Sequence, residues 1–123
     1  MIAHGYAKDV DIATDLASVL QGGMGMAASA NIGDNHMLFE PVHGSSPKYA
    51  GQNKVNPIAA LSSTQLMFES LGSRNNDDEA ILCSEVLERA ISEHLSSGAP
   101  VTYDLGGQAS TTQVGSAIAQ SCR

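Results

Sequence analysis

Apolar residues in the first third of the chain follow two different spacings. Between residues 9 and 21 they recur every three to four positions, which predicts a helix, and the glycines at 22–23 end it. Its apolar positions are Ile12, Leu16, Val19 and Leu20. Residues 24–35 are mostly small or turn-forming, so we expect a loop there. The short apolar run at residues 37–42 predicts a buried strand.

The second half of the chain has a mainly helical pattern. A helix is predicted over residues 57–71, with proline at its favoured first position and a stop at Gly72. Asn75 or Asn76 caps a longer helix that ends at Gly98, and the acidic residues after the cap suit the positive end of its dipole. The apolar face of this helix comprises Cys83, Val86, Leu87, Ala90, Ile91 and Leu95.

The last part of the chain returns to an extended pattern before a final helix. Residues 101–105 are predicted to be extended, the glycines at 106–107 to form a turn, and residues 110–112 to cap the final helix. Strands and helices alternate, which indicates the α/β class. The strands are too few for a complete sheet, so we expect residues 1–123 to form one partial domain.

The composition excludes several classes of protein. The formal net charge is −7 at pH 7, whereas a general nucleic-acid binder needs a basic face. No apolar stretch approaches the length that spans a membrane, and we expect no signal peptide after Met1. Cys83 and Cys122 lack the spacing of metal ligands, so we expect two reduced thiols. The sequence therefore predicts a cytoplasmic protein that binds neither nucleic acid nor membranes.

Two carboxylates in the first predicted helix form a candidate metal site. Asp11 and Asp15 are four positions apart, which places both on one face of the helix. Carboxylates this close repel each other unless a cation lies between them, and oxygen ligands favour Mg²⁺ or Mn²⁺. The alternative is an ordinary acidic helix start, because Asp9 lies in the same region and carboxylates stabilise the positive end of a helix dipole.

The segment at residues 39–57 combines a strand end, a loop rich in Gly, Pro, Ser, Asn and Lys, and the start of a helix. Proteins often hold a phosphate with this arrangement, because backbone N–H groups of the loop and the helix start point toward the anion. The N–H groups of residues 43–45 are the candidates, and Lys48 and Tyr49 are available for a further phosphate or for stacking. The alternative is a surface loop made of turn-forming residues.

Three segments together resemble the β-decarboxylating dehydrogenases, which include isocitrate, 3-isopropylmalate, homoisocitrate and tartrate dehydrogenases. They are residues 22–33, 39–57 and 103–107, and the run Glu-Pro-Val-His-Gly-Ser-Ser-Pro carries the likeness most specifically. The match extends from about Asp11 to the C-terminus. It implies the C-terminal part of the large domain of an isocitrate/isopropylmalate dehydrogenase-like fold. It also implies an enzyme that oxidises a 2-hydroxy acid with NAD or NADP and releases the β-carboxylate as carbon dioxide.

The resemblance assigns roles to the candidate residues. Asp11 and Asp15 correspond to two aspartates that hold Mg²⁺ or Mn²⁺ beside the substrate. Asn56 corresponds to the residue that meets the adenine edge. The loop that wraps the adenosine and its phosphates corresponds to His43, Gly44, Ser45 and Ser46.

Cofactor choice depends on residues toward the end of the same loop. NAD-using relatives tend to carry an acidic pair where this chain has Lys48 and Tyr49, and a lysine there attracts a 2′-phosphate instead. Together with Val55 and Tyr103, these two residues resemble the NADP-dependent isocitrate dehydrogenases. NADP enzymes usually place an arginine near Gly107, however, where this chain has the Gly-Gly turn typical of NAD enzymes. These two signals conflict, and we expect NADP in preference to NAD.

The resemblance also implies that this segment does not act alone. Complete family members are roughly three times as long and form homodimers. Their substrate-binding arginines, catalytic tyrosine and lysine, and a third metal-binding aspartate have no counterpart in residues 1–123, so we expect no catalytic residue here. Activity would need a longer chain or a complementing chain in a dimer. The alternative is a non-catalytic remnant, or a binding or regulatory module that pairs with a full-length homologue.

Overall fold

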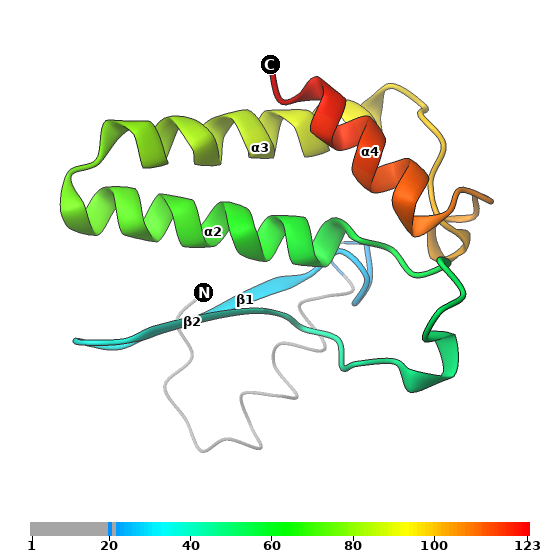
Figure 1. Cartoon of the computed structure of the whole chain (residues 1–123), viewed down its shortest axis with the longest axis horizontal. Helices are drawn as coiled ribbons and strands as arrows, with labels where there is room; N and C mark the ends of the chain where they lie inside the picture. Colours follow the sequence, from blue (N-terminus) through cyan, green and yellow to red (C-terminus); the bar gives the residue numbers. More distant parts are fainter. Residues whose placement is uncertain (1–19, 21) are drawn as a thin grey trace.

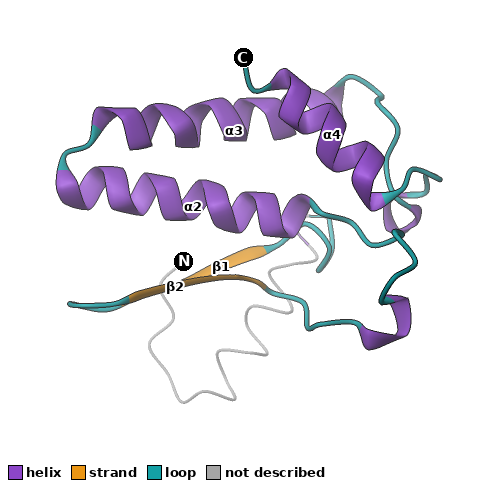
Figure 2. Ribbon diagram, in the orientation of Figure 1, coloured by secondary structure: helices purple, strands orange, loops and turns teal. Residues whose placement is uncertain are grey.

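The computed structural model describes Leu20 and residues 22–123, and these form three layers (Figures 1 and 2). A two-stranded sheet is the first layer, α2 the second, and α3 with α4 the third. The strands are β1 (Ala28–Ile32) and β2 (Met37–Pro41), and the helices are α2 (Ile58–Asn75), α3 (Asp78–Ser96) and α4 (Thr111–Ser121). Apart from Leu20, the predicted helix at residues 9–21 lies outside the described residues.

β1 and β2 form an antiparallel hairpin that packs against α2 (Figure 1). The register pairs Ile32 with Met37 at the turn end of the hairpin. The prediction of a loop over residues 24–35 is therefore wrong for β1. This strand is built from small and polar residues with a weak intrinsic preference for extended structure, and its pairing with β2 determines its conformation.

β2 is half-buried, whereas the apolar run predicts a fully buried strand. Its side chains alternate, with Met37, Phe39 and Pro41 partly covered and with Leu38 and Glu40 exposed. A hairpin that lays one face on a helix requires this period of two. Leu38 is consequently 56% exposed on the opposite face of the sheet.

α2 continues past Gly72, which the sequence predicts as its end. Gly72 is buried, and a Cβ built on it would lie 2.7 Å from Cδ1 of Ile81 in α3. The glycine therefore permits close contact between the two helices. The helix ends at Asn75 instead, and Asn76 follows it in the left-handed conformation with a φ of 53°. The cap of α3 is Asp77 rather than Asn75 or Asn76, because its carboxylate accepts hydrogen bonds from two N–H groups of the first turn.

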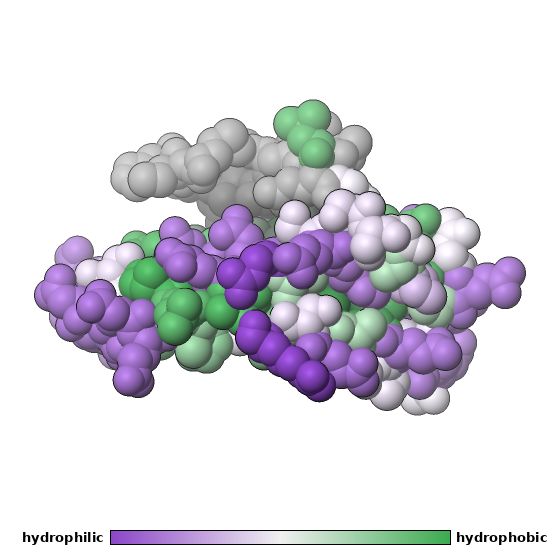
Figure 3. Space-filling model, turned by 90° about the horizontal axis from the view of Figure 1, so that it is seen from above, coloured by the Kyte–Doolittle hydropathy of each residue, from purple (hydrophilic) through white to green (hydrophobic). Residues whose placement is uncertain are grey.

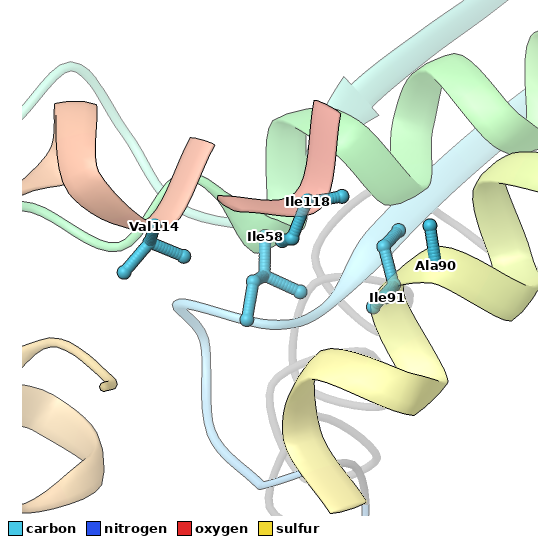
Figure 4. Close-up of a cluster of buried hydrophobic side chains, with 5 residues drawn as sticks. All are labelled: Ile58, Ala90, Ile91, Val114 and Ile118. Carbon is cyan, nitrogen blue, oxygen red and sulfur yellow. The ribbon is translucent and has the colours of Figure 1, made fainter. Parts of the chain in front are cut away.

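The core lies where the start of α2, the end of α3 and α4 meet (Figure 4). Its buried members are Ile58, Ala90, Ile91, Val114 and Ile118. Burial of each isoleucine or valine side chain contributes about 1.5–3 kcal/mol to the free energy of unfolding. Cys83 is exposed, so the apolar face of α3 is narrower than its sequence pattern predicts. α4 begins with a capping box between Ser110 and Gln113, in agreement with the predicted cap.

Residues 101–105 contain a tight turn where the sequence predicts an extended segment. Tyr103–Leu105 forms one turn of 3₁₀ helix, and Gly106 follows it with a φ of 83°. The predicted Gly-Gly turn is confirmed. A Cβ on Gly107 would lie only 1.9 Å from the carbonyl oxygen of Val101, so the backbone here leaves room for glycine alone.

The α/β class and the incomplete sheet agree with the sequence-based prediction. The face of the molecule that carries α3 and α4 is largely hydrophilic, with small apolar areas between polar side chains (Figure 3). None of the described helices combines the length and the hydropathy needed to cross a bilayer.

Candidate functional site

A cleft of about 510 Å³ is lined by the loop after β2 and by the 103–107 turn. These two segments lie at the same end of the molecule (Figure 1). This volume falls within the range of small-molecule sites, about 300–1,000 Å³. All the residues predicted to contact a cofactor line it except Lys48, whose side chain is exposed outside it. The predicted residues in its lining are His43, Gly44, Ser45, Ser46, Tyr49, Val55, Asn56 and Tyr103.

The cleft also has walls that the sequence analysis did not predict. Met24 and Gly25 contribute from the segment before β1, and Thr111 contributes from the start of α4. Ala50, Gly51, Asn53 and Asp104 complete the lining. The sequence assigns none of these residues a role in a site, and only the fold brings Met24, Gly25, Asp104 and Thr111 beside the 39–57 loop.

The side chain of Asn56 joins the loop to two other elements. It is buried, and its Nδ2 donates a hydrogen bond of 2.9 Å to Oδ2 of Asp104. Its Oδ1 accepts a hydrogen bond of 3.0 Å from the N–H of Ile58, the first residue of α2. The predicted contact of Asn56 with an adenine edge stays a prediction. The structure gives this side chain a fixed orientation at the base of the cleft.

The carboxylate of Asp104 is held from a second side. The hydroxyl of Thr102, which is fully buried, donates to Oδ1 of Asp104 at 2.5 Å. Gly25 lies directly against this pair, since a Cβ built on it would be 2.7 Å from Oδ2 of Asp104 and 3.3 Å from Cβ of Asn56. A side chain at position 25 would therefore displace the carboxylate. The segment before β1, the loop and the turn thus share one hydrogen-bonded junction.

The start of α4 is clamped to the loop by Asn53. The carbonyl of Asn53 accepts from the N–H of Thr111 at 3.0 Å, and its Oδ1 accepts from both the N–H and the hydroxyl of Thr112. The hydroxyl of Ser110 accepts the next N–H, that of Gln113. The first-turn donors of α4 therefore hold the loop in place instead of facing a ligand.

The start of α2 is also occupied by the protein itself. The N–H of Ile58 donates to Asn56, and the N–H of Ala59 donates to the carbonyl of Gly25 at 3.1 Å. The sequence analysis expects both the loop and the helix start to offer N–H groups to a phosphate. In the structure these two α2 donors fasten the walls of the cleft, which leaves the loop as the source of donors.

Residues 43–46 supply those donors. Within the described part of the chain, no hydrogen bond engages the backbone N–H groups of these residues. Gly44, Ser45 and Ser46 are exposed, and Ser46 has a left-handed φ of 44°. Successive N–H groups next to a left-handed residue form a concave surface that suits an anion.

An aromatic pair with two lysines lies at the edge of the cleft. The rings of Tyr49 and Tyr103 have centroids 5.8 Å apart and planes inclined by 42°. Nζ of Lys48 lies 5.6 Å from the centroid of Tyr49. Nζ of Lys54 lies 4.8 Å from the centroid of Tyr103 and 5.9 Å from that of Tyr49. Lys48 and both tyrosines are among the predicted cofactor contacts, whereas Lys54 is not.

The pKa values of the two tyrosines are shifted in opposite directions. A side-chain hydrogen bond from Tyr103, followed by the positive charge of Lys48, lowers the pKa of Tyr49. The same hydrogen bond raises the pKa of Tyr103, because it keeps this hydroxyl protonated as the donor. The cluster therefore presents electropositive character around Tyr49.

The candidate metal ligands belong to the N-terminal part of the chain. Asp11 and Asp15 lie outside the described residues, so the Mg²⁺ or Mn²⁺ site stays a prediction. Over Leu20 and residues 22–123, no group of three or more His, Cys, Asp or Glu side chains is arranged to hold a metal ion.

Comparison with known proteins gives consistent matches. Residues 9–118 match the family described as isocitrate/isopropylmalate dehydrogenase. An isocitrate dehydrogenase [NADP] of Archaeoglobus fulgidus is 47% identical over 105 residues, covering 85% of this chain and 24% of that protein. A 3-isopropylmalate dehydrogenase of Methanothermobacter thermautotrophicus is 44% identical over 110 residues, covering 89% and 31%.

Solved structures show the same likeness. The crystal structure of isocitrate dehydrogenase from Methylococcus capsulatus superposes with a TM-score of 0.80 at 38% identity, covering 92% of this chain and 32% of that one. The TT0538 protein from Thermus thermophilus gives a TM-score of 0.83 at 41% identity, covering 94% and 22%. The chain thus spans less than a third of the length of each of these relatives.

Proposed function

The chain belongs to the isocitrate/isopropylmalate dehydrogenase family, and we propose that it is the C-terminal NAD(P)- and metal-binding portion of such an enzyme. The family uses NAD(P) and a divalent metal to oxidise and decarboxylate small acids. The observation that carries the proposal is the 510 Å³ cleft, which gathers the predicted nucleotide contacts from separate parts of the chain. Family membership and site geometry therefore point to the same surface.

The cleft offers different chemistry along its length. The N–H groups of residues 43–46 are donors for the phosphates, and the tilted tyrosine pair offers ring faces and hydroxyls to the adenosine. Asn56 and Asp104 fix the base of the cleft through their mutual hydrogen bond. Prior fixation of these walls lowers the entropy cost of binding.

NADP is the cofactor that the charge of the site favours. Lys48 and Lys54 both lie within 6 Å of the Tyr49 ring, where a ribose 2′-phosphate would add negative charge. The Archaeoglobus fulgidus relative carries NADP in its name. Gly107 is the feature that favours NAD, because NADP enzymes usually place an arginine there.

In the complete enzyme, bound nicotinamide supplies a hydride acceptor and the divalent metal a Lewis acid for a 2-hydroxy acid substrate. Asp11 and Asp15 are the proposed metal ligands from this chain. The catalytic side chains come from elsewhere, either from a longer chain or from a complementing chain in a dimer, so residues 1–123 alone are inactive. Two free thiols, Cys83 and Cys122, suit a cytoplasmic location.

A second candidate function is a non-catalytic module that pairs with a full-length homologue. The described sheet has only two strands, and Ile32 and Leu38 on it are more than half exposed, which suits pairing with further strands. The chain also spans less than a third of its relatives. Co-purification of a tagged chain with a full-length relative, without any change in turnover of that relative, would favour this function.

Nucleotide binding by residues 1–123 tests the main proposal. Calorimetric titration with NADP⁺ is expected to show saturable binding, and Ser45→Asp is expected to weaken it at least tenfold by placing a carboxylate among the phosphate donors. Ser92→Asp is the matched control, because Ser92 is exposed on α3 away from the cleft. A folded chain that binds no nucleotide, or equal effects of both substitutions, would overturn the proposal.

A further inference from the structure

Lys54 lies close to both tyrosine rings, and the sequence assigns it no role in the 39–57 segment. Its Nζ lies 4.8 Å from the centroid of Tyr103 and 5.9 Å from that of Tyr49. Contact with ring faces restrains an ammonium group without neutralising it, because the rings carry no net charge. The lysine is exposed, so its remaining N–H donors are accessible to a ligand.

A second hollow lies beside Tyr103 and Lys54. Its volume is about 430 Å³, and Lys54, Tyr103 and Gly107 are among its lining residues. Lys54 therefore faces the space beside position 107. That position carries no side chain, and the 1.9 Å approach of a Cβ to the Val101 carbonyl oxygen excludes a larger residue without movement of the backbone.

The start of α4 also lies beside this hollow, but its N–H donors are already hydrogen-bonded within the protein. The first-turn N–H groups of α4 bond to Asn53 and Ser110, so the helix start has few donors left for an anion. The neighbouring carboxylate, Asp104, accepts hydrogen bonds from Thr102 and Asn56 and is thereby held in the cleft base.

We propose that Lys54 is a specificity residue that binds the 2′-phosphate of the adenosine ribose, supplying the cation that position 107 cannot carry. The inference rests on the proposed nucleotide-binding function of the cleft. A phosphate monoester carries about −1.5 to −2 charges at pH 7, so two lysines match it better than one. Nζ of Lys48 and Nζ of Lys54 lie 5.6 and 5.9 Å from the centroid of the same ring, that of Tyr49.

The test compares two small nucleotides that differ only at the ribose 2′ position. Adenosine 2′,5′-bisphosphate and 5′-AMP are titrated into the 123-residue chain, the Lys54→Met variant and the Lys54→Arg variant. Lys54→Met is expected to lower affinity for the bisphosphate about tenfold and to leave 5′-AMP binding nearly unchanged. Lys54→Arg is expected to retain most of the preference. Circular dichroism confirms folding, and Arg89→Met, on the exposed side of α3, controls for net charge.

The outcomes separate this inference from the function on which it rests. If the unmodified chain prefers the bisphosphate and Lys54→Met keeps the same preference, Lys54 has no specificity role although the cleft still binds nucleotide. If Arg89→Met reduces the preference as much as Lys54→Met, net charge alone is responsible and the inference is overturned. If the folded chain binds neither nucleotide, the proposed function fails, and this inference fails with it.

Discussion

The side chain of Asn56 donates a hydrogen bond of 2.9 Å to the carboxylate of Asp104, 48 positions later in the chain. The same amide accepts from the first N–H of α2, while the same carboxylate accepts from the hydroxyl of Thr102. Two segments that are separated by α2 and α3 are thereby fixed against each other at the base of the cleft. The shape of the proposed nucleotide site depends on this junction.

Removal of the Asn56 amide should therefore weaken both stability and binding. Asn56→Ala leaves the Asp104 carboxylate without one donor and the buried N–H of Ile58 without its acceptor, which costs about 1–3 kcal/mol of unfolding free energy. Urea denaturation measures the change. Asn31→Ala in β1 is the control, because Asn31 is exposed, and it should change the midpoint little. Equal midpoints for the two variants would contradict the role assigned to Asn56.

Two helical glycines should respond in opposite ways to alanine. Gly72→Ala places a Cβ 2.7 Å from the Ile81 side chain and 2.9 Å from its backbone nitrogen, so α2 and α3 must separate, at a cost of about 1–3 kcal/mol. Gly115→Ala in α4 meets no heavy atom within 4 Å and should stabilise the chain by about 0.5–1 kcal/mol. Thermal unfolding of both variants tests the pair. Stabilisation by Gly72→Ala would show that the helices do not pack as described.

Tyrosine ionisation provides a test of the aromatic pair. Tyr49 has a lowered pKa and Tyr103 a raised one, so Tyr49 loses its proton first as the pH rises. In Tyr103→Phe the hydrogen bond to the Tyr49 phenolate is absent, and the pKa of Tyr49 should rise toward its ordinary value. Ultraviolet difference titration follows the phenolate. An unchanged alkaline titration of Tyr49 in this variant would contradict the described contact.

Reversal of charge at Lys48 should shift cofactor preference. Lys48→Asp places a carboxylate beside Tyr49, where it repels a 2′-phosphate and can accept a hydrogen bond from a ribose 2′-hydroxyl. The ratio of affinities for adenosine 2′,5′-bisphosphate and 5′-AMP should fall about tenfold. Arg89→Asp makes the same charge change on α3, and it should leave the ratio unaltered. An unchanged ratio in Lys48→Asp would refute the assignment of this residue.

Local signals in the sequence predict the elements whose ends are determined by neighbouring residues. The capping box of Ser110 and Gln113 lies within four residues, and the start of α4 agrees with its prediction. β1 has no such signal, because its conformation depends on pairing with β2. Gly72 carries the usual mark of a helix end, but its contact with Ile81 across α2 and α3 determines its role.

The candidate site likewise combines features that neighbouring residues determine with features that depend on distant contacts. The 39–57 loop could be selected from sequence because its turn-forming residues and the family likeness are contiguous. Lys54 could not, since its position is defined by Tyr103, which comes from a distant turn. Gly25 and Asp104 lie in segments that carry the family likeness, but the sequence assigns them no role. Their proximity arises only after the segment before β1 and the 103–107 turn fold against α2.

Amide chemical-shift mapping tests the central claim most directly. Adenosine 2′,5′-bisphosphate is added to isotopically labelled chain, and the account predicts saturable shifts of the N–H signals of residues 43–46 together with those of Tyr49, Lys54 and Tyr103. The N–H signals on the exposed side of α3, such as that of Arg89, should not move. Saturable shifts centred away from the cleft, or none in a folded chain, would contradict the account.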